Sequence, residues 1–258
     1  MLVTACRQKD TVMTRRVALI TDCNLHLGPD LARKLAARDH DLILGDPLPG
    51  LVGEVEALGA DVVAVQGCRD LVDGSAIARL IAVGLERFGR LDAACVRTGV
   101  IIGGRFTEAT LEQLQTLQGA NQEAVFHALQ ALLAVMVPNG AGQIVIVTSA
   151  TGRRPVPASA LYSATRAGAN MMVKAAALDV ADKGVCINAL GTNFLDYPGF
   201  IKANGADDPE VRSRVEKRTP MHRLGRPDEV AHFAASLLDG ENRFQTGQFF
   251  SLSGGWSD

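Results

Sequence analysis

The chain has 258 residues, of which 47% are hydrophobic, and a formal net charge of -2 at pH 7. This composition is sufficient for a sizeable buried core. Acidic and basic residues are scattered along the sequence, which argues against binding to nucleic acid or to a membrane surface. The sequence also lacks an apolar run of the roughly 18 residues that a membrane span needs, and a signal-peptide core. We therefore expect a cytoplasmic protein with a small-molecule ligand.

The sequence predicts an N-terminal extension followed by a single domain. Residues 1–13 are predicted to be a disordered extension, and 14–258 to form one α/β domain, because no linker composition divides them. Short apolar runs alternate with longer helical patterns, which predicts a doubly wound, parallel, seven-stranded sheet with helices on both faces. The predicted strands are 17–21, 41–44, 62–66, 93–96, 144–148, 185–190 and 248–252.

The turn after the first predicted strand, ITDCNLHLG at 20–28, has an unusual composition. A strand, tight turn and helix in this order often carry glycines that let the backbone approach a nucleotide phosphate. Here Asp22 and His26 stand at two of the glycine positions, and Gly28 remains. Asp22 could cap the following helix, but either way the turn leaves little room for a dinucleotide.

The cysteines are odd in number and far apart, and no CxxC or HExxH spacing occurs. This pattern predicts free thiols in a reducing compartment and no metal site. The five positions are Cys6, Cys23, Cys68, Cys95 and Cys186.

A serine and a tyrosine follow the fifth predicted strand. Ser149 precedes Tyr162 by thirteen positions in SATGRRPVPASALYSATRAG. This spacing resembles the Ser and Tyr-x-x-x-Lys signature of the short-chain dehydrogenase/reductases, and the likeness covers almost the whole chain. It implies a Rossmann-like single domain. The supporting segments are ERFGRLDAA, Asn121, RLGRPDEVA and TGQFFSLSGGW.

Four departures from that family lie on the side of the cofactor: the opening turn, Arg166 in place of lysine, VRTG at 96–99, and Thr192-Asn193 in place of Pro-Gly. With Ser149 and Tyr162 intact, the chain resembles the halohydrin dehalogenases, especially those that accept bulky or cyclic epoxides. The resemblance implies a carbon-halide lyase that needs no cofactor and no metal. It would close vicinal halohydrins to epoxides and open epoxides with azide, cyanide or nitrite.

The resemblance also implies roles for individual residues. Tyr162 would exchange the hydroxyl proton, Arg166 would favour its phenolate, and Ser149 would orient the substrate oxygen. Free halide or a pseudohalide would bind at the segment after the sixth strand, with a histidine walling the site. The expected halide site comprises Thr192, Asn193, Phe194, Leu195 and His26, and the expected substrate pocket comprises Gly103, Gly104, Pro155, Val156, Tyr197 and Phe200.

Other candidates have structural interpretations. Asn121 is expected to bond within a helix irregularity, and Asp46 and Asp70 to face solvent in turns at strand ends. The long helical stretches near 109–137 and 162–182 match the interface helices of tetrameric relatives, so a homotetramer is expected. Two alternatives stay open: an NAD(P)-dependent reductase with a degenerate turn, favoured by Asp46, and a non-catalytic binding protein of the same fold.

Overall fold

Seven strands form one parallel sheet in the computed structural model, which describes residues 15–257. The predicted extension at 1–13 lies outside the described residues. The strand order is β3-β2-β1-β4-β5-β6-β7, so the chain reverses direction across the sheet between β1 and β4. The predicted fold class is confirmed. The bounds are β1 Arg16–Ile20, β2 His40–Gly45, β3 Val62–Val65, β4 Ala93–Arg97, β5 Gly142–Ser149, β6 Val185–Thr192 and β7 Phe249–Leu252.

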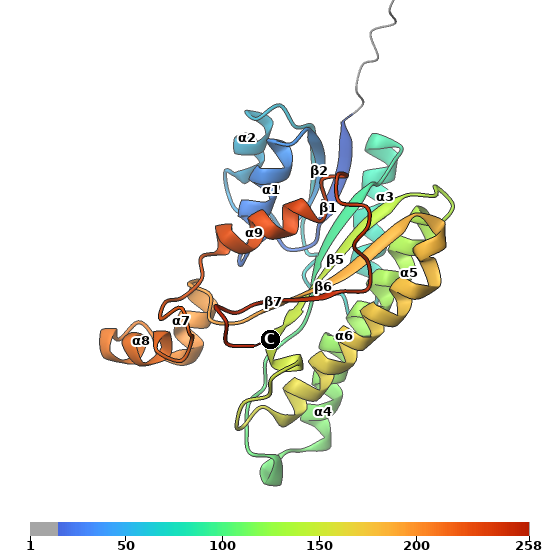
Figure 1. The fold of residues 1–258 in the computed structure, drawn as a ribbon. Helices are drawn as coiled ribbons and strands as arrows, with labels where there is room; N and C mark the ends of the chain where they lie inside the picture. Colours follow the sequence, from blue (N-terminus) through green and yellow to red (C-terminus); the bar gives the residue numbers. More distant parts are fainter. Residues whose placement is uncertain (1–14, 258) are drawn as a thin grey trace, which may run out of the picture.

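Helices cover both faces of the sheet (Figure 1). One face carries α1 (Gly28–Ala36), α2 (Leu51–Glu56) and α9 (Pro227–Ser236). The other carries α3 (Ser75–Phe88), α5 (Ala124–Met136) and α6 (Ala160–Val180), with α4 (Leu111–Gln118) beside the start of α6. Two short helices, α7 (Pro198–Asn204) and α8 (Pro209–Glu216), follow β6 and project away from the sheet.

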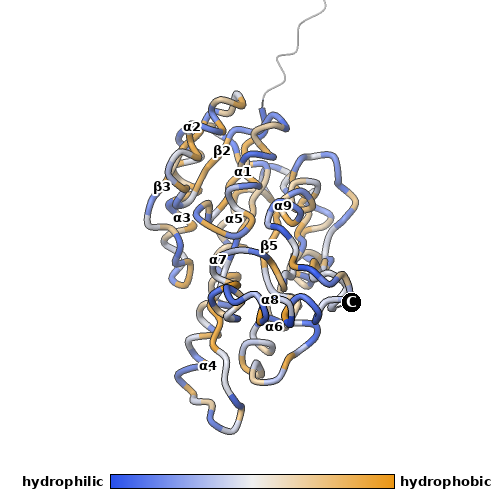
Figure 2. Tube along the Cα trace, turned by 90° about the vertical axis from the view of Figure 1, so that its left-hand side faces the viewer, coloured by the Kyte–Doolittle hydropathy of each residue, from blue (hydrophilic) through white to orange (hydrophobic). Residues whose placement is uncertain are grey.

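The central strands are hydrophobic because both faces of the sheet are covered. All eight residues of β5 are buried, and β2 and β5 are coloured as hydrophobic in Figure 2. The pairing of β5 with β6 extends from Gly142 opposite Val185 to Ser149 opposite Thr192. Both strands are longer than their apolar runs predict, since backbone pairing continues through polar residues. The last pair places Ser149 and Thr192 side by side at the carboxyl edge.

The predicted helix near 109–137 is interrupted by one turn of π-helix, Gly119–Glu123. Asn121 lies in this turn and is completely buried. Its side-chain amide donates to Thr165 Oγ1 of α6 at 3.0 Å. The expected helix irregularity is therefore present, and its asparagine bonds to the neighbouring helix.

Within residues 15–257, no helix is both long and apolar enough to pass through a bilayer. That part of the chain likewise contains no cluster of three or more His, Cys, Asp or Glu side chains suited to a metal ion. The four cysteines it includes are free thiols: Cys23, Cys68, Cys95 and Cys186.

Close packing at the first turn generates a prediction about Gly28. A Cβ atom added there would lie 1.9 Å from the backbone oxygen of Asp22. Because backbone cannot yield cheaply, we expect Gly28→Ala to lower the free energy of unfolding by about 1–3 kcal/mol. The matched control is Gly53→Ala in α2, where an added Cβ meets nothing within 4 Å. It should be neutral or stabilising by up to about 1 kcal/mol. Urea unfolding of both variants checks this, and equal stability would contradict it.

Candidate functional site

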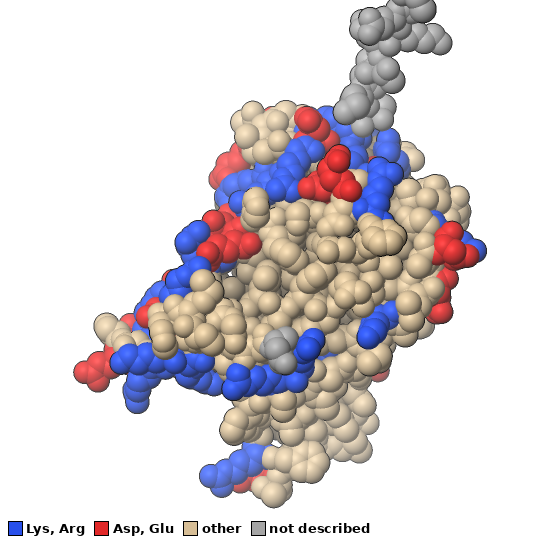
Figure 3. Space-filling view, in the orientation of Figure 1, with Lys and Arg blue, Asp and Glu red and all other residues tan. Residues whose placement is uncertain are grey.

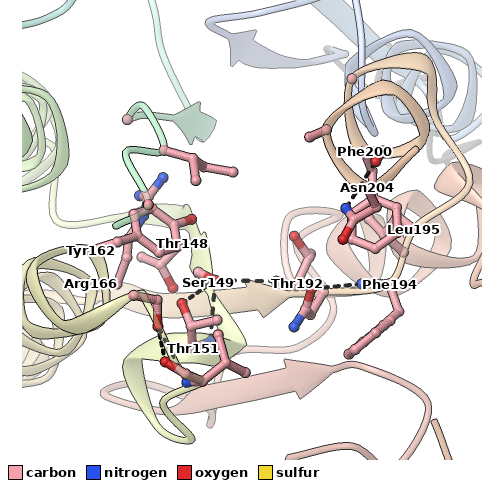
Figure 4. Close-up of a pocket in the computed structure, with 18 of the residues that line it drawn as sticks. Thr148, Ser149, Thr151, Tyr162, Arg166, Thr192, Phe194, Leu195, Phe200 and Asn204 are labelled. Atoms are coloured by element: carbon pink, nitrogen blue, oxygen red, sulfur yellow. Dashed lines mark hydrogen bonds between the residues drawn. The ribbon is translucent and has the colours of Figure 1, made fainter. Parts of the chain in front are cut away.

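A cavity of about 300 Å³ lies at the carboxyl ends of the strands (Figure 4). Open parallel sheets bind ligands at this edge, near the point where strand order reverses. Tyr162 and Arg166 reach it from α6, and Phe200 and Asn204 reach it from the opposite side, on α7. Ser149 and Thr192 lie between these two walls at the ends of β5 and β6.

Ser149 is held by the turn that follows β5. Its hydroxyl lies 2.8 Å from Thr151 Oγ1 and accepts a bond from the Thr151 backbone N–H at 3.2 Å. It also lies 3.5 Å from the carbonyl oxygen of Thr192. These contacts fix the hydroxyl at the cavity edge, where it can still hydrogen-bond a substrate oxygen.

Tyr162 and Arg166 are one helical turn apart and both are buried. The Arg166 guanidinium carbon lies 5.3 Å from the centre of the Tyr162 ring. Its Nη2 donates to the Thr98 carbonyl oxygen at 2.8 Å, and Nη1 is 3.4 Å from Thr98 Oγ1. Arg166 is therefore an interior residue, held by the end of β4. The guanidinium of Arg166 thus lies beside the Tyr162 ring in the cavity.

The residue after Thr98 must be glycine. Gly99 has a φ of 98°, and an added Cβ would lie 2.1 Å from Asn121 Oδ1 and 2.2 Å from Arg166 Nη2. The end of β4 thus approaches the arginine closely enough to anchor it. Sequence reasoning noted VRTG as a departure but missed that its threonine positions Arg166.

His26 fills the cavity side of the first turn. Its φ is 59° and its Nε2 lies 3.3 Å from Thr192 Oγ1. Its ring makes an edge-to-face contact with Tyr197, with ring centres 5.0 Å apart. Burial, with the nearby charges of Arg97 and Arg166, lowers the pKa of His26 to about 3. The ring is therefore neutral at pH 7 and forms part of the wall.

Asp22 is only 4% exposed and pairs across the sheet. Its Oδ2 accepts from Arg97 Nη1 at 2.8 Å, and Arg69 Nε lies 4.0 Å away. Its Oδ1 accepts from the Asn24 backbone N–H at 3.2 Å. The N-cap of α1 is Leu27 and has no side-chain bond, so the interpretation of Asp22 as a helix cap is wrong. Arg97 is a functional neighbour that sequence reasoning did not single out.

In the segment after β6, the backbone N–H groups of Asn193 and Phe194 already donate hydrogen bonds within the protein. The Asn193 N–H donates to the Leu252 carbonyl at 3.4 Å, and the Phe194 N–H donates to Asn193 Oδ1 at 2.9 Å. The Phe194 ring packs edge-to-face on Trp256 with centres 5.5 Å apart. The residues of the expected halide site do line the cavity, Leu195 included. However, the N–H groups of Asn193 and Phe194 are not free to hold an anion.

Most of the expected substrate-pocket residues line the same cavity, namely Gly103, Val156, Tyr197 and Phe200. The prediction for Pro155 is wrong, because Val156 and Pro157 line the cavity in its place. Gly104 borders a separate small hollow. Further lining residues were missed because no local pattern marks them: Thr98, Thr151, Asn204 and Arg218.

Asp46 and Asp70, which were both expected to face solvent, differ in their exposure. Asp46 is buried, and its oxygens accept from the backbone N–H groups of Gly67 at 2.6 Å and Cys68 at 2.8 Å. The prediction for Asp46 is therefore wrong, because those two donors lie in a loop that packs beside β2. Asp70 is exposed as expected and accepts from the Val72 N–H at 3.0 Å.

A second cavity of about 730 Å³ adjoins the first along the same edge of the sheet. Asp22, Arg69 and Asp70 line it, and it shares Arg97, Thr98 and Gly99 with the first cavity. The two hollows therefore form neighbouring parts of one edge.

Comparison with known proteins identifies relatives across almost the whole chain. A family model described as enoyl-(acyl carrier protein) reductase matches residues 27–257. The 2,5-dichloro-2,5-cyclohexadiene-1,4-diol dehydrogenase LinX of Sphingobium indicum is 32% identical over 94% of this chain and 96% of its own length. The 3-oxoacyl-(acyl-carrier-protein) reductase of Synechocystis is 28% identical over 95% and 98%.

Solved structures give the same result. The structure of ElxO with NADP bound has a TM-score of 0.83 at 25% identity, and covers 94% of this chain and 98% of ElxO. Levodione reductase also has a TM-score of 0.83 at 25% identity, with 93% and 96% covered.

These relatives overturn the predicted activity. They are dehydrogenases and reductases, so the prediction of a halohydrin dehalogenase, a carbon-halide lyase, is wrong. The halide-binding role assigned to Thr192–Leu195 and His26 loses its basis with it. The alternative of a reductase-type enzyme with an altered turn agrees better with the comparisons.

The buried neutral His26 makes stability depend on pH. The pKa of this histidine is ordinarily 6.5 and is about 3 in the folded chain, so the unfolded chain takes up the proton first. The free energy of unfolding therefore has its full value above pH 6.5 and decreases as the pH falls toward 3. Asparagine tolerates positive φ and has no ring to titrate. When the pH is lowered from 7 to 5, we expect the free energy of unfolding of His26→Asn to decrease by about 2 kcal/mol less than that of the wild type.

Urea unfolding at several pH values measures this difference. The control is His222→Asn, because His222 is exposed and also has a backbone in the left-handed region, with a φ of 52°. Parallel pH profiles for the wild type and His26→Asn would contradict the prediction.

Proposed function

Because the chain belongs to the short-chain dehydrogenase/reductase family, we propose that it is an oxidoreductase that interconverts a hydroxyl and a carbonyl group in a small, largely apolar substrate. The observation that carries the proposal is the burial of Ser149, Tyr162 and Arg166 around one cavity of about 300 Å³. The diol dehydrogenase and the levodione reductase among the relatives support this reaction class.

The chain's own residues supply the proton transfer. In oxidation, the substrate hydroxyl proton passes to the Tyr162 oxygen, and in reduction the Tyr162 hydroxyl returns a proton to the carbonyl oxygen. A nicotinamide dinucleotide, when bound, would accept the hydride from the carbinol carbon in the first direction and supply it in the second. Ser149 donates a hydrogen bond to the same substrate oxygen and orients it. Arg166, anchored by the Thr98 carbonyl, stabilises the phenolate form by its charge.

The redox partner poses a difficulty at the first turn. ElxO was solved with NADP bound. In this chain, however, a buried carboxylate and a buried imidazole stand at the positions where glycines let a pyrophosphate approach the backbone. Asp22 is fixed by Arg97 and His26 by the wall of the cavity. The residues of this turn do not fit a pyrophosphate held against the backbone in that manner. A dinucleotide would have to place its pyrophosphate farther from the turn, and the adjoining cavity of about 730 Å³, lined by Arg69 and Arg97, offers room for it.

Dinucleotide binding and alcohol oxidation test the proposal together. NADH and NADPH are titrated into the purified chain by nicotinamide fluorescence, and cyclohexanol and 1,2-cyclohexanediol are offered with each oxidised form. We expect saturable binding of one dinucleotide and its reduction by at least one alcohol. Absence of both binding and turnover would overturn the proposal.

Replacement of the tyrosine tests the proton transfer. We expect Tyr162→Phe to lower kcat by about 10²- to 10⁴-fold, because the proton loses its acceptor. Tyr197→Phe removes a hydroxyl from the same cavity and should cost less than about tenfold. Steady-state kinetics with a substrate found above measures both. Equal losses, or an active Tyr162→Phe, would contradict the role of Tyr162.

A further inference from the structure

A cavity of about 460 Å³ lies at the opposite edge of the sheet from the substrate cavity. Its lining includes Gly142 and Val185, the first residues of β5 and β6, and Arg16, the first residue of β1. Because it opens at the amino ends of the strands, it is separated from Tyr162 by the length of the sheet. The reaction proposed above makes no use of it.

Arg16 lines this cavity and forms no ion pair with a carboxylate among residues 15–257, although Asp92 and Asp239 act on its charge from farther away. Its Nη2 donates to Gln143 Oε1 at 2.9 Å, and its Nε donates to His40 Nε2 at 3.2 Å. His40 Nδ1 lies 2.7 Å from the Arg38 carbonyl and must donate to it, so Nε2 is the acceptor. Burial lowers the pKa of His40, which keeps that ring neutral, and burial also lowers the pKa of Arg16. Among residues 15–257, Arg16 has only uncharged hydrogen-bond partners.

A second guanidinium adds to this charge. Arg243 lines the cavity, and its Nε donates to the Gly240 carbonyl at 2.7 Å. The carboxylate of Asp92 also lines the cavity, but it is occupied by Arg90 at 2.7 Å and by the Val17 N–H at 2.8 Å. Asp239, the other acid that acts on Arg16, is paired with Arg38 at 2.7 Å. Two guanidiniums thus remain without a carboxylate in the described part of the chain.

The remaining lining is mostly small or apolar. Val185, Ala141 and Ala181 contribute, and Phe244 on the rim is completely exposed. A guanidinium binds a planar carboxylate through paired hydrogen bonds, and ligand sites combine apolar walls with a few charged groups. We propose that this cavity binds a small carboxylate that carries an aryl or acyl tail, with Arg16 and Arg243 on the carboxylate and Phe244 on the tail.

Calorimetric titration of the full chain with benzoate, and separately with inorganic phosphate, tests the proposal. We expect saturable benzoate binding that Arg243→Gln weakens by at least about tenfold, since a charged hydrogen bond is lost. Arg105→Gln, which removes the same charge from an 80% exposed side chain, should leave the affinity unchanged. No saturable heat, unchanged affinity in Arg243→Gln, or phosphate binding as tight as benzoate would overturn it.

Cys186 provides an independent readout of location, because it lines this cavity and is partly exposed, whereas Cys23, Cys68 and Cys95 are buried. In a Cys6→Ser background, benzoate should slow alkylation of Cys186 severalfold, as followed by mass spectrometry. Unchanged alkylation at saturating benzoate would place the ligand elsewhere and overturn the proposal. Neither readout depends on turnover or dinucleotide binding, so this test can fail or succeed independently of the proposed oxidoreductase activity.

Discussion

The buried carboxylate of Asp22 is the constraint on which the site depends. An isolated carboxylate in a protein interior costs several kcal/mol, so it must have a partner. That partner is Arg97, the last residue of β4, whose Nη1 lies 2.8 Å from Asp22 Oδ2. Strand β4 lies next to β1 in the sheet. The pair ties the first turn to the neighbouring strand at the point where strand order reverses. It also fixes the path of the chain toward His26.

The position of His26 follows from that path and gives the cavity its electrostatic character. The ring is buried against Tyr197 and Thr192, beside two arginines, and it stays neutral. Three guanidiniums line the cavity: Arg97 is paired with Asp22, Arg166 is bonded to Thr98, and Arg218 lies over the Phe194 ring. The cavity therefore places a phenol, Tyr162, beside the buried guanidinium of Arg166, with the neutral ring of His26 in its wall.

Charge is distributed unevenly over the face of the molecule that Figure 3 shows. In Figure 3, Lys and Arg side chains gather over α7 and α8, whereas the broad surface over β6 and β7 is almost uncharged. Of these two helices, α7 contributes Phe200 and Asn204 to the wall of the cavity that contains Tyr162. Phe194, Phe200 and Trp256 hold the two helices to the domain through a small apolar cluster separate from the two main cores.

The sequence by itself determined the seven strands and their parallel arrangement, because strand and helix periodicity are local properties. That Ser149, Tyr162 and Arg166 share one cavity was implied by the resemblance of their spacing to a family signature, not by periodicity. It misdirected the functional prediction, since a few substitutions around a shared fold do not specify a reaction. Only the tertiary structure decided that Asp22 pairs with Arg97, that Thr98 anchors Arg166, and that Asp46 turns toward Gly67. These contacts join segments 21 to 75 residues apart. Their formation depends on which charges the packed core leaves buried together, and no local pattern records that.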